Sequence, residues 1–165
     1  MSAAASDPRP RPLYTPSQRA RRDATVWTTV QGVLAPLQFL VFAVSLVLVL
    51  RYLATGDGYV AATVSILAKT ALLYTIMVTG AIWEKVVFGQ YLFAPAFFWE
   101  DVVSFVVIAL HTVYLYGLLS ETLAPLQLML IALAAYATYF VNATQFLLKL
   151  RRARLDTAPP RGHPA

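Results

Sequence analysis

Hydrophobic residues gather into four long runs along the chain, at 26–50, 59–83, 102–119 and 125–148. Each run is about long enough to cross a hydrocarbon core some 30 Å thick as a helix that rises ~1.5 Å per residue. Strands are not expected, because an isolated strand in lipid leaves its backbone groups unpaired and a barrel needs shorter segments of alternating polarity. The pattern therefore predicts an all-α integral membrane bundle of four transmembrane helices.

Polar and turn-forming residues separate these runs. Residues 55–58, with the sequence Thr-Gly-Asp-Gly, indicate a tight turn, and residues 120–124 indicate a second short connection. Residues 1–25 and 149–165 are basic and contain several prolines. We interpret these two segments as tails that flank a single transmembrane domain at 26–148.

The composition excludes several classes of protein. Of the 165 residues, 59% are hydrophobic and only 13% are charged, and the mean hydropathy is +0.64. A soluble domain carries about a quarter charged residues, so a water-soluble monomer is not expected. The chain has no cysteine, which excludes a disulfide framework, a thiolate nucleophile, a Cys-ligated zinc site and an iron–sulfur cluster.

The positions of the basic residues predict the orientation of the bundle. Eleven of the 13 Lys and Arg residues lie in the two tails or in the connection between the second and third runs, and Arg51 lies on the other side. By the positive-inside rule, both termini and the middle connection are cytoplasmic. Topology and anionic lipid headgroups thus explain the net charge of +5, and no nucleic-acid partner is expected.

Three carboxylates flank the middle connection. Glu84 closes the second run, and Glu100 and Asp101 open the third. An Asp at a helix start commonly caps free N–H groups, and we favour this structural role for Asp101. Glu84 lies at a helix C-terminus, where a negative charge is unfavourable, so it is the stronger candidate for a general acid.

The middle connection itself is aromatic. Residues 86–99 contain six aromatic side chains, and Gly89 and Pro95 make the segment too broken to span a membrane. It should lie in the interface or re-enter the bundle. The commoner interpretation is an aromatic belt that anchors helix ends. The adjacent carboxylates favour the other interpretation, a flat apolar shelf for a large planar ligand.

Two further ionisable residues lie inside the runs. His111 shares a helix face with Glu100 and Ser104, because eleven residues return to nearly the same face. It is either a hydrogen-bonding residue between helices or, with equal weight, an axial ligand to a metallated macrocycle or a proton relay. Lys69 has no acidic partner in the runs, so it either extends outward to the interface or meets an anionic ligand group.

Polar residues also form stripes at helical spacing. The fourth run carries Thr138, Asn142 and Gln145 in line with Lys149, and the first carries Gln31, Gln38 and Ser45. Such stripes should face the bundle interior, where contacts between helices explain them at least as well as ligand binding does. The chain has only two His residues, so a metal centre held by the protein alone is not expected.

Longer segments resemble a known family, the 3-vinyl (bacterio)chlorophyllide hydratases of bacteriochlorophyll biosynthesis. The resemblance covers roughly residues 14–155, in order and at matching spacing. It is carried by YTP at 14–16, RARRDATVW at 19–27, QGVLAPLQF at 31–39, YTIMVTGAIWEK at 74–85, YLFAPAFFWED at 91–101, and YATY at 136–139 continuing to Lys149.

The resemblance implies a hydro-lyase that adds water across the C3 vinyl group of chlorophyllide a, or of its bacteriochlorin counterpart, to give a 1-hydroxyethyl group. It implies no cofactor beyond the magnesium that belongs to the substrate. The expected surroundings are the lipid bilayer of a bacterial inner, photosynthetic membrane, with the active site towards the cytoplasm and neighbouring pigment-synthesis enzymes as candidate partners. The rival hypothesis is a non-enzymatic pigment-binding or assembly protein that uses His111 as axial ligand.

We assign roles to individual residues from the sequence alone. A neutral Glu would protonate the terminal vinyl carbon, and a second carboxylate or a His would orient the attacking water. The acid is Glu84 or Glu100, and the other of these or Asp101 is the base. The candidate catalytic residues are Glu84, Glu100, Asp101 and His111, and the candidate substrate-binding residues are Lys69, Tyr74, Trp83, Tyr91, Phe97, Trp99, Asn142 and Gln145.

Overall fold

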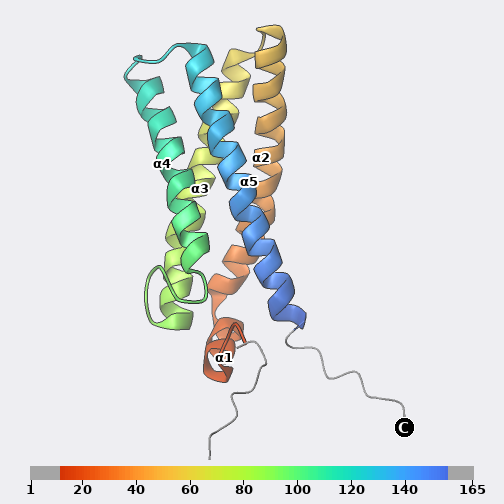
Figure 1. The fold of residues 1–165 in the computed structure, drawn as a ribbon, viewed down its shortest axis with the longest axis vertical. Helices are drawn as coiled ribbons and strands as arrows, with labels where there is room; N and C mark the ends of the chain where they lie inside the picture. The colour runs from red at the N-terminus through yellow and green to blue at the C-terminus, as the bar shows by residue number, and fades with distance from the viewer. Residues whose placement is uncertain (1–11, 156–165) are drawn as a thin grey trace, which may run out of the picture.

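The computed structural model describes residues 12–155, and side chains as far as residue 153. Within that range the chain forms helices and no strand (Figure 1). The outer parts of the two predicted tails, 1–11 and 156–165, lie outside the described residues. Four of the helices are long and apolar enough to cross a membrane, which confirms the predicted all-α class and the four spans. The helices are α1 (Pro16–Ala24), α2 (Val26–Thr55), α3 (Tyr59–Phe88), α4 (Phe98–Leu119) and α5 (Pro125–Leu155).

Each long helix extends beyond the apolar run that predicts it. Helix α3 continues past Glu84 as far as Phe88, and α4 begins at Phe98, so that Glu100 and Asp101 lie in its first turn. A charged side chain does not end a helix by itself. The break comes at Gly89, whose φ of 89° is a left-handed conformation that glycine adopts without steric cost.

Helix α1 lies within the segment that the sequence assigned to the N-terminal tail. Thr15 and Gln18 form a capping box, and Pro16 occupies the first helical position, where it costs no hydrogen bond. The guanidinium group of Arg21 donates to the Val87 carbonyl oxygen at 2.9 and 2.7 Å. This carbonyl lies in the last turn of α3, where no intrahelical donor is available. Arg21 of α1 supplies the missing donor and so caps the C-terminal end of α3.

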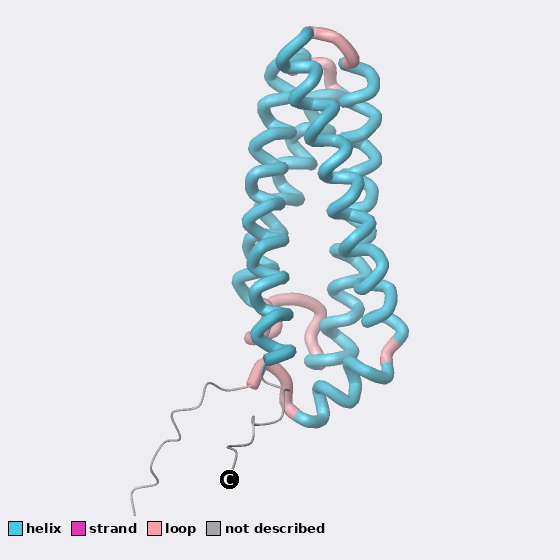
Figure 2. The backbone as a smooth tube through the Cα atoms, turned by 90° about the vertical axis from the view of Figure 1, so that its right-hand side faces the viewer, coloured by secondary structure: helices cyan, strands magenta, loops and turns pink. Residues whose placement is uncertain are grey.

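The four long helices pack as two pairs, α2 with α3 and α4 with α5. Figure 2 shows the two pairs as two layers that lie side by side along the bundle. Helix α1, the loop at 89–97 and the last turns of α5 lie at one end, which we call the terminal end (Figure 1). The turns at 56–58 and 120–124 lie at the other end, which we call the far end.

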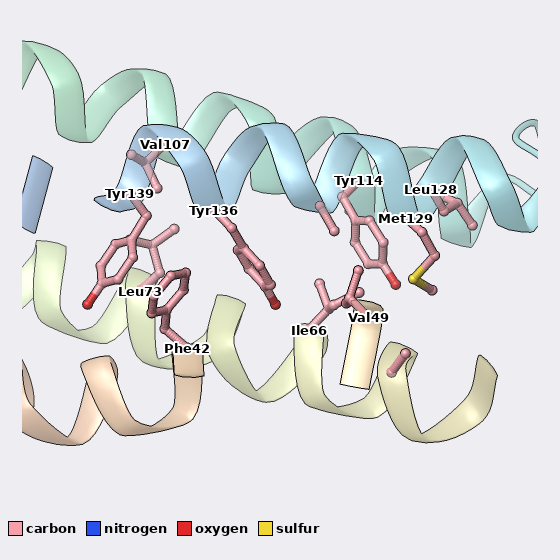
Figure 3. Close-up of a cluster of buried hydrophobic side chains, with 12 residues drawn as sticks. Phe42, Val49, Ile66, Leu73, Val107, Tyr114, Leu128, Met129, Tyr136 and Tyr139 are labelled. Atoms are coloured by element: carbon pink, nitrogen blue, oxygen red, sulfur yellow. The ribbon is translucent and has the colours of Figure 1, made fainter. Parts of the chain in front are cut away.

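The core lies between the two pairs and is unusually rich in tyrosine. Figure 3 shows Tyr114, Tyr136 and Tyr139 pointing from α4 and α5 towards the side chains of α2 and α3. The ring of Phe42 packs against Tyr136 and Tyr139 at centroid distances of 5.4 and 4.9 Å. The Tyr136 hydroxyl group shares a hydrogen bond of 2.5 Å with Ser45. The bundle interior is therefore polar enough to hold hydroxyl groups deep between apolar helices.

Candidate active site

Glu84 and Asp101 form a carboxyl pair at the terminal end of the bundle. Helix α3 carries Glu84 in its last turns and α4 carries Asp101 in its first, and both side chains are buried. The two carboxyl groups lie within hydrogen-bonding reach of each other. A hydrogen bond between them needs one proton, because an ionised carboxylate only accepts. The pair can therefore hold a single proton and release it, as general acid catalysis requires.

The loop at 89–97 folds over this pair and is fastened to it. The backbone N–H of Ala94 donates to Glu84 Oε2 at 3.1 Å, and the N–H of Phe93 donates to Asp101 Oδ2 at 2.7 Å. Phe93 has a φ of 59°, a left-handed conformation that costs an aromatic residue about 1–3 kcal/mol. Two consecutive N–H groups thus donate to the carboxyl pair. The strained backbone at Phe93 is the cost of this arrangement, and the two hydrogen bonds help to offset it.

The predicted capping role of Asp101 is wrong. The N-cap of α4 is Phe97, and no side chain caps the helix there. Asp101 lies one turn further on, and its carboxylate turns back to the loop instead of to the N–H groups of its own helix. The sequence shows an acid in the first turn, but not that the preceding loop would return to meet it.

Glu100 has a partner of its own. Its carboxylate accepts from Lys149 Nζ of α5 at 2.5 Å, and Lys149 also donates to the Ala96 carbonyl oxygen. The Glu100 side chain is 7% exposed and that of Lys149 is 23% exposed. Glu100 is therefore committed to a cation that also ties α5 to the loop, whereas Glu84 and Asp101 face each other.

Asn142 extends this network away from the carboxylates. Its Nδ2 donates to Ser104 Oγ at 2.7 Å, and Ser104 in turn donates to the Glu100 carbonyl oxygen. Among the residues that the structure describes, none forms a hydrogen bond with the buried Oδ1 of Asn142 or the buried Oε1 of Gln145. The polar stripe predicted on the fourth run thus faces the interior and reaches the same end as Glu100.

The aromatic residues do not form one shelf, so that prediction is corrected. Phe97 and Trp83 point inward and pack on each other, and Trp83 Nε1 donates to Thr28 Oγ1 at 2.9 Å. Tyr91 and Trp99 are 60% and 69% exposed. The loop divides these side chains because its backbone turns sharply at Phe93. The inward cluster consists of Tyr14, Trp83, Phe88, Phe97 and Phe146, and the outward group consists of Tyr91, Phe93, Phe98, Trp99 and Phe105.

His111 lies in the interior, apart from the carboxyl pair. Ten residues separate it from Asp101 along α4, which corresponds to a rise of about 15 Å. Its Nδ1 contacts the Val107 carbonyl oxygen at 2.8 Å, and its buried Nε2 has no hydrogen-bond partner in the described part of the chain. His111 therefore cannot act on the same atom as Asp101, but it can hold a different part of a large ligand.

Lys69 is fully buried and does not extend outward to the interface. Its ammonium group lies 3.6 Å from the centre of the Tyr139 ring and has no hydrogen-bond partner within residues 12–155. Tyr74, by contrast, is half-buried and bonds to Thr112 Oγ1 at 2.8 Å, which joins α3 to α4. Sequence reasoning did not find Tyr139, because nothing in its spacing distinguishes it from the other apolar residues of α5.

All four long helices carry buried polar atoms that have no hydrogen-bond partner among the described residues. They include Gln38 Oε1 from α2, Lys69 Nζ from α3, His111 Nε2 from α4 and Asn142 Oδ1 from α5. A buried polar atom without a partner costs free energy, and more so where lipid surrounds the bundle. Atoms of this kind from every helix indicate a place where polar groups of a ligand, or water, complete the bonding.

Comparison with known proteins gives a consistent result. A model of the family described as 2-vinyl bacteriochlorophyllide hydratase (BCHF) matches residues 14–152. A protein of that name from Cereibacter sphaeroides is 77% identical over 146 residues, which are 88% of this chain and 91% of the relative. Another from Rhodobacter capsulatus is 71% identical over 152 residues, or 92% of this chain and 88% of the relative. No solved structure matches the chain.

Proposed function

Since the chain belongs to the 2-vinyl bacteriochlorophyllide hydratase family, we propose that it is a hydro-lyase that adds water to the vinyl group of a chlorophyllide or bacteriochlorophyllide. The vinyl group numbered 2 in the relatives' names is the one numbered 3 in the nomenclature used above. The product carries a 1-hydroxyethyl group in its place. The match over nearly the whole chain carries this proposal, and the carboxyl pair supplies chemistry that fits it.

In the proposed mechanism, the proton held between Glu84 and Asp101 moves to the terminal vinyl carbon. The resulting positive charge at the inner carbon is delocalised into the macrocycle. Water attacks the inner carbon and loses a proton to the carboxylate that gave one up, so the pair ends with the proton it began with. The reaction changes no net oxidation state, and the proposal assigns no cofactor to this chain.

Glu100 has a positioning role in this proposal. Its ion pair with Lys149 lies beside the carboxyl pair and holds α5 against the loop through Ala96. A carboxylate already neutralised by an ammonium group is a poor proton donor. The contacts therefore favour Glu84 and Asp101 as the acid and base, and Glu100 as a residue that keeps the loop in place.

His111 is the proposed ligand of the substrate's magnesium, through its unpartnered Nε2. We expect the protein to bind chlorophyllide a more tightly than the metal-free pigment, and His111→Ala to bind the two alike. Titration of pigment absorbance measures both affinities, and added imidazole should restore the preference in the variant. Val113→Ala, an exposed neighbour, is the control. A variant that keeps the full preference for the metallated pigment contradicts this role.

We also propose the setting of the reaction. The distribution of Lys and Arg favours a cytoplasmic terminal end, so the carboxyl pair would face the cytoplasmic side of a bacterial inner, photosynthetic membrane. A macrocycle that partitions into lipid can reach the bundle from the bilayer, and enzymes that supply or consume it are the natural partners.

The purified protein incubated with chlorophyllide a tests the activity directly. We expect the long-wavelength absorption band to move to the blue as the vinyl group leaves conjugation, and the pigment to gain the mass of one water. A heat-denatured sample serves as control. A spectral shift with pigment of unchanged mass would mean binding without turnover, and would support the rival assignment as a pigment-binding protein.

A further inference from the structure

Lys69 is the ionisable residue that the proposed reaction does not use. It is fully buried in α3, and its ammonium lies over the Tyr139 ring, 3.6 Å from the ring centre. His111 also lies near it, but adds no negative charge. An ammonium group inside a membrane bundle is costly unless it is paired or used. No described carboxylate pairs with Lys69, so an anion from outside the chain would complete this site.

His111 and Lys69 both lie further into the bundle than the carboxyl pair. Glu84 and Asp101 meet at the terminal end, so positions along α3 and α4 can both be counted from that level. The α-carbon of His111 lies ten residues from that level and the α-carbon of Lys69 fifteen, which correspond to rises of about 15 and 22 Å, and the Lys69 side chain runs back from there to Tyr139. The ammonium of Lys69 lies on the ring of Tyr139, and His111 packs against Tyr136, three residues further from the terminal end on α5. Both groups therefore lie at a similar depth, further into the bundle than the carboxyl pair.

In a chlorophyllide, the metal and the propionate carboxylate both lie away from the vinyl group. The metal lies nearer to the vinyl group than the carboxylate of the propionate side chain does. When the vinyl group meets the carboxyl pair, the metal and the carboxylate are both directed further into the bundle, towards His111 and Lys69. An ammonium group and a carboxylate form a charge-assisted hydrogen bond, and Tyr139 would support the ammonium from its other side.

We infer that Lys69 binds the free carboxylate of the substrate and thereby fixes which edge of the macrocycle faces Glu84 and Asp101. This inference rests on the proposed function, since it takes the substrate from there. It adds a determinant of specificity: the protein selects pigments with a free acid over their esters, which have no charge to offer Lys69.

The test compares chlorophyllide a with its methyl ester, which share the vinyl group and the metal. Dissociation constants come from titrating each pigment into the full chain in detergent. We expect the unaltered protein to bind the acid roughly ten to a hundred times more tightly than the ester. In Lys69→Met the acid should bind as weakly as the ester does. Lys85→Met removes an exposed lysine from the same helix and should keep the preference.

Lys69→Gln gives the same comparison with a polar group beside Tyr139, should the Met variant fail to fold. Equal affinities for acid and ester in the unaltered protein, or an undiminished preference in a folded Lys69 variant, would overturn the inference. These outcomes are separate from turnover. A protein that forms the hydrated product without preferring the acid refutes the carboxylate site alone, and one that prefers the acid but forms no product refutes the hydratase alone.

Discussion

Glu84→Gln and Asp101→Asn should each lower the rate of vinyl hydration by about two to four orders of magnitude. Each substitution keeps the shape of the side chain and an oxygen that can accept from the loop, but it removes the ability to take up and release a proton. The two residues share one proton in the proposed mechanism, so the effects should not add in the double variant. Product formation from chlorophyllide a under single-turnover conditions measures the rate.

Pigment binding separates this effect from damage to the fold. Both variants should bind chlorophyllide a about as well as the unaltered protein, because the pair acts on the vinyl group and not on the metal or the carboxylate. Asp57→Asn, in the exposed turn at the far end, is the matched control and should keep full activity. Full activity in both Glu84→Gln and Asp101→Asn would refute the carboxyl pair as the source of the proton.

The second large effect concerns stability. Lys149→Met should lower the free energy of unfolding by about 3 kcal/mol, because it leaves the buried carboxylate of Glu100 without its cation. It also removes the donor to Ala96, which ties α5 to the loop. Replacing both partners, as in Glu100→Gln with Lys149→Met, should recover much of the loss, since no uncompensated charge then remains.

Unfolding in mixed micelles at graded denaturant, followed by circular dichroism, measures these differences. Arg152→Met removes an exposed basic residue from the same helix and should change the stability by less than about 0.5 kcal/mol. A Lys149→Met variant as stable as the Arg152 control would show that the ion pair contributes nothing. A double variant no more stable than the single one would show that the unpaired charge is not the cause.

The fold is largely predictable because lipid leaves the backbone few choices. Uninterrupted apolar runs must be helices, and four of them give the bundle. The helix ends are less predictable, since Glu84 and Lys85 suggested an end that Gly89 sets one turn later. Helix α1 carried a usable signal, the capping-box spacing of Thr15 and Gln18, which the abundance of proline and arginine obscured.

The sequence predicts where the site lies, but not the role of each residue in it. The carboxylates flank one connection, so their proximity follows from the order of the helices. The sequence does not predict which carboxylate has which role, because this depends on Lys149, which pairs with Glu100 although 49 positions separate the two residues. The division of the aromatic side chains likewise depends on the left-handed backbone at Phe93, and no pattern of residues marks that conformation in advance.

The loop at 89–97 is the sole covalent link between the two helix pairs, and it is also the segment that covers the carboxyl pair. If α2 and α3 swing away from α4 and α5, the loop is the hinge about which they turn. Glu84 and Asp101 stand on opposite sides of that hinge, so admitting a macrocycle between the pairs pulls on the two N–H contacts that hold the loop closed. A movement that admits a macrocycle between the pairs would therefore also loosen the contacts that cover the acid.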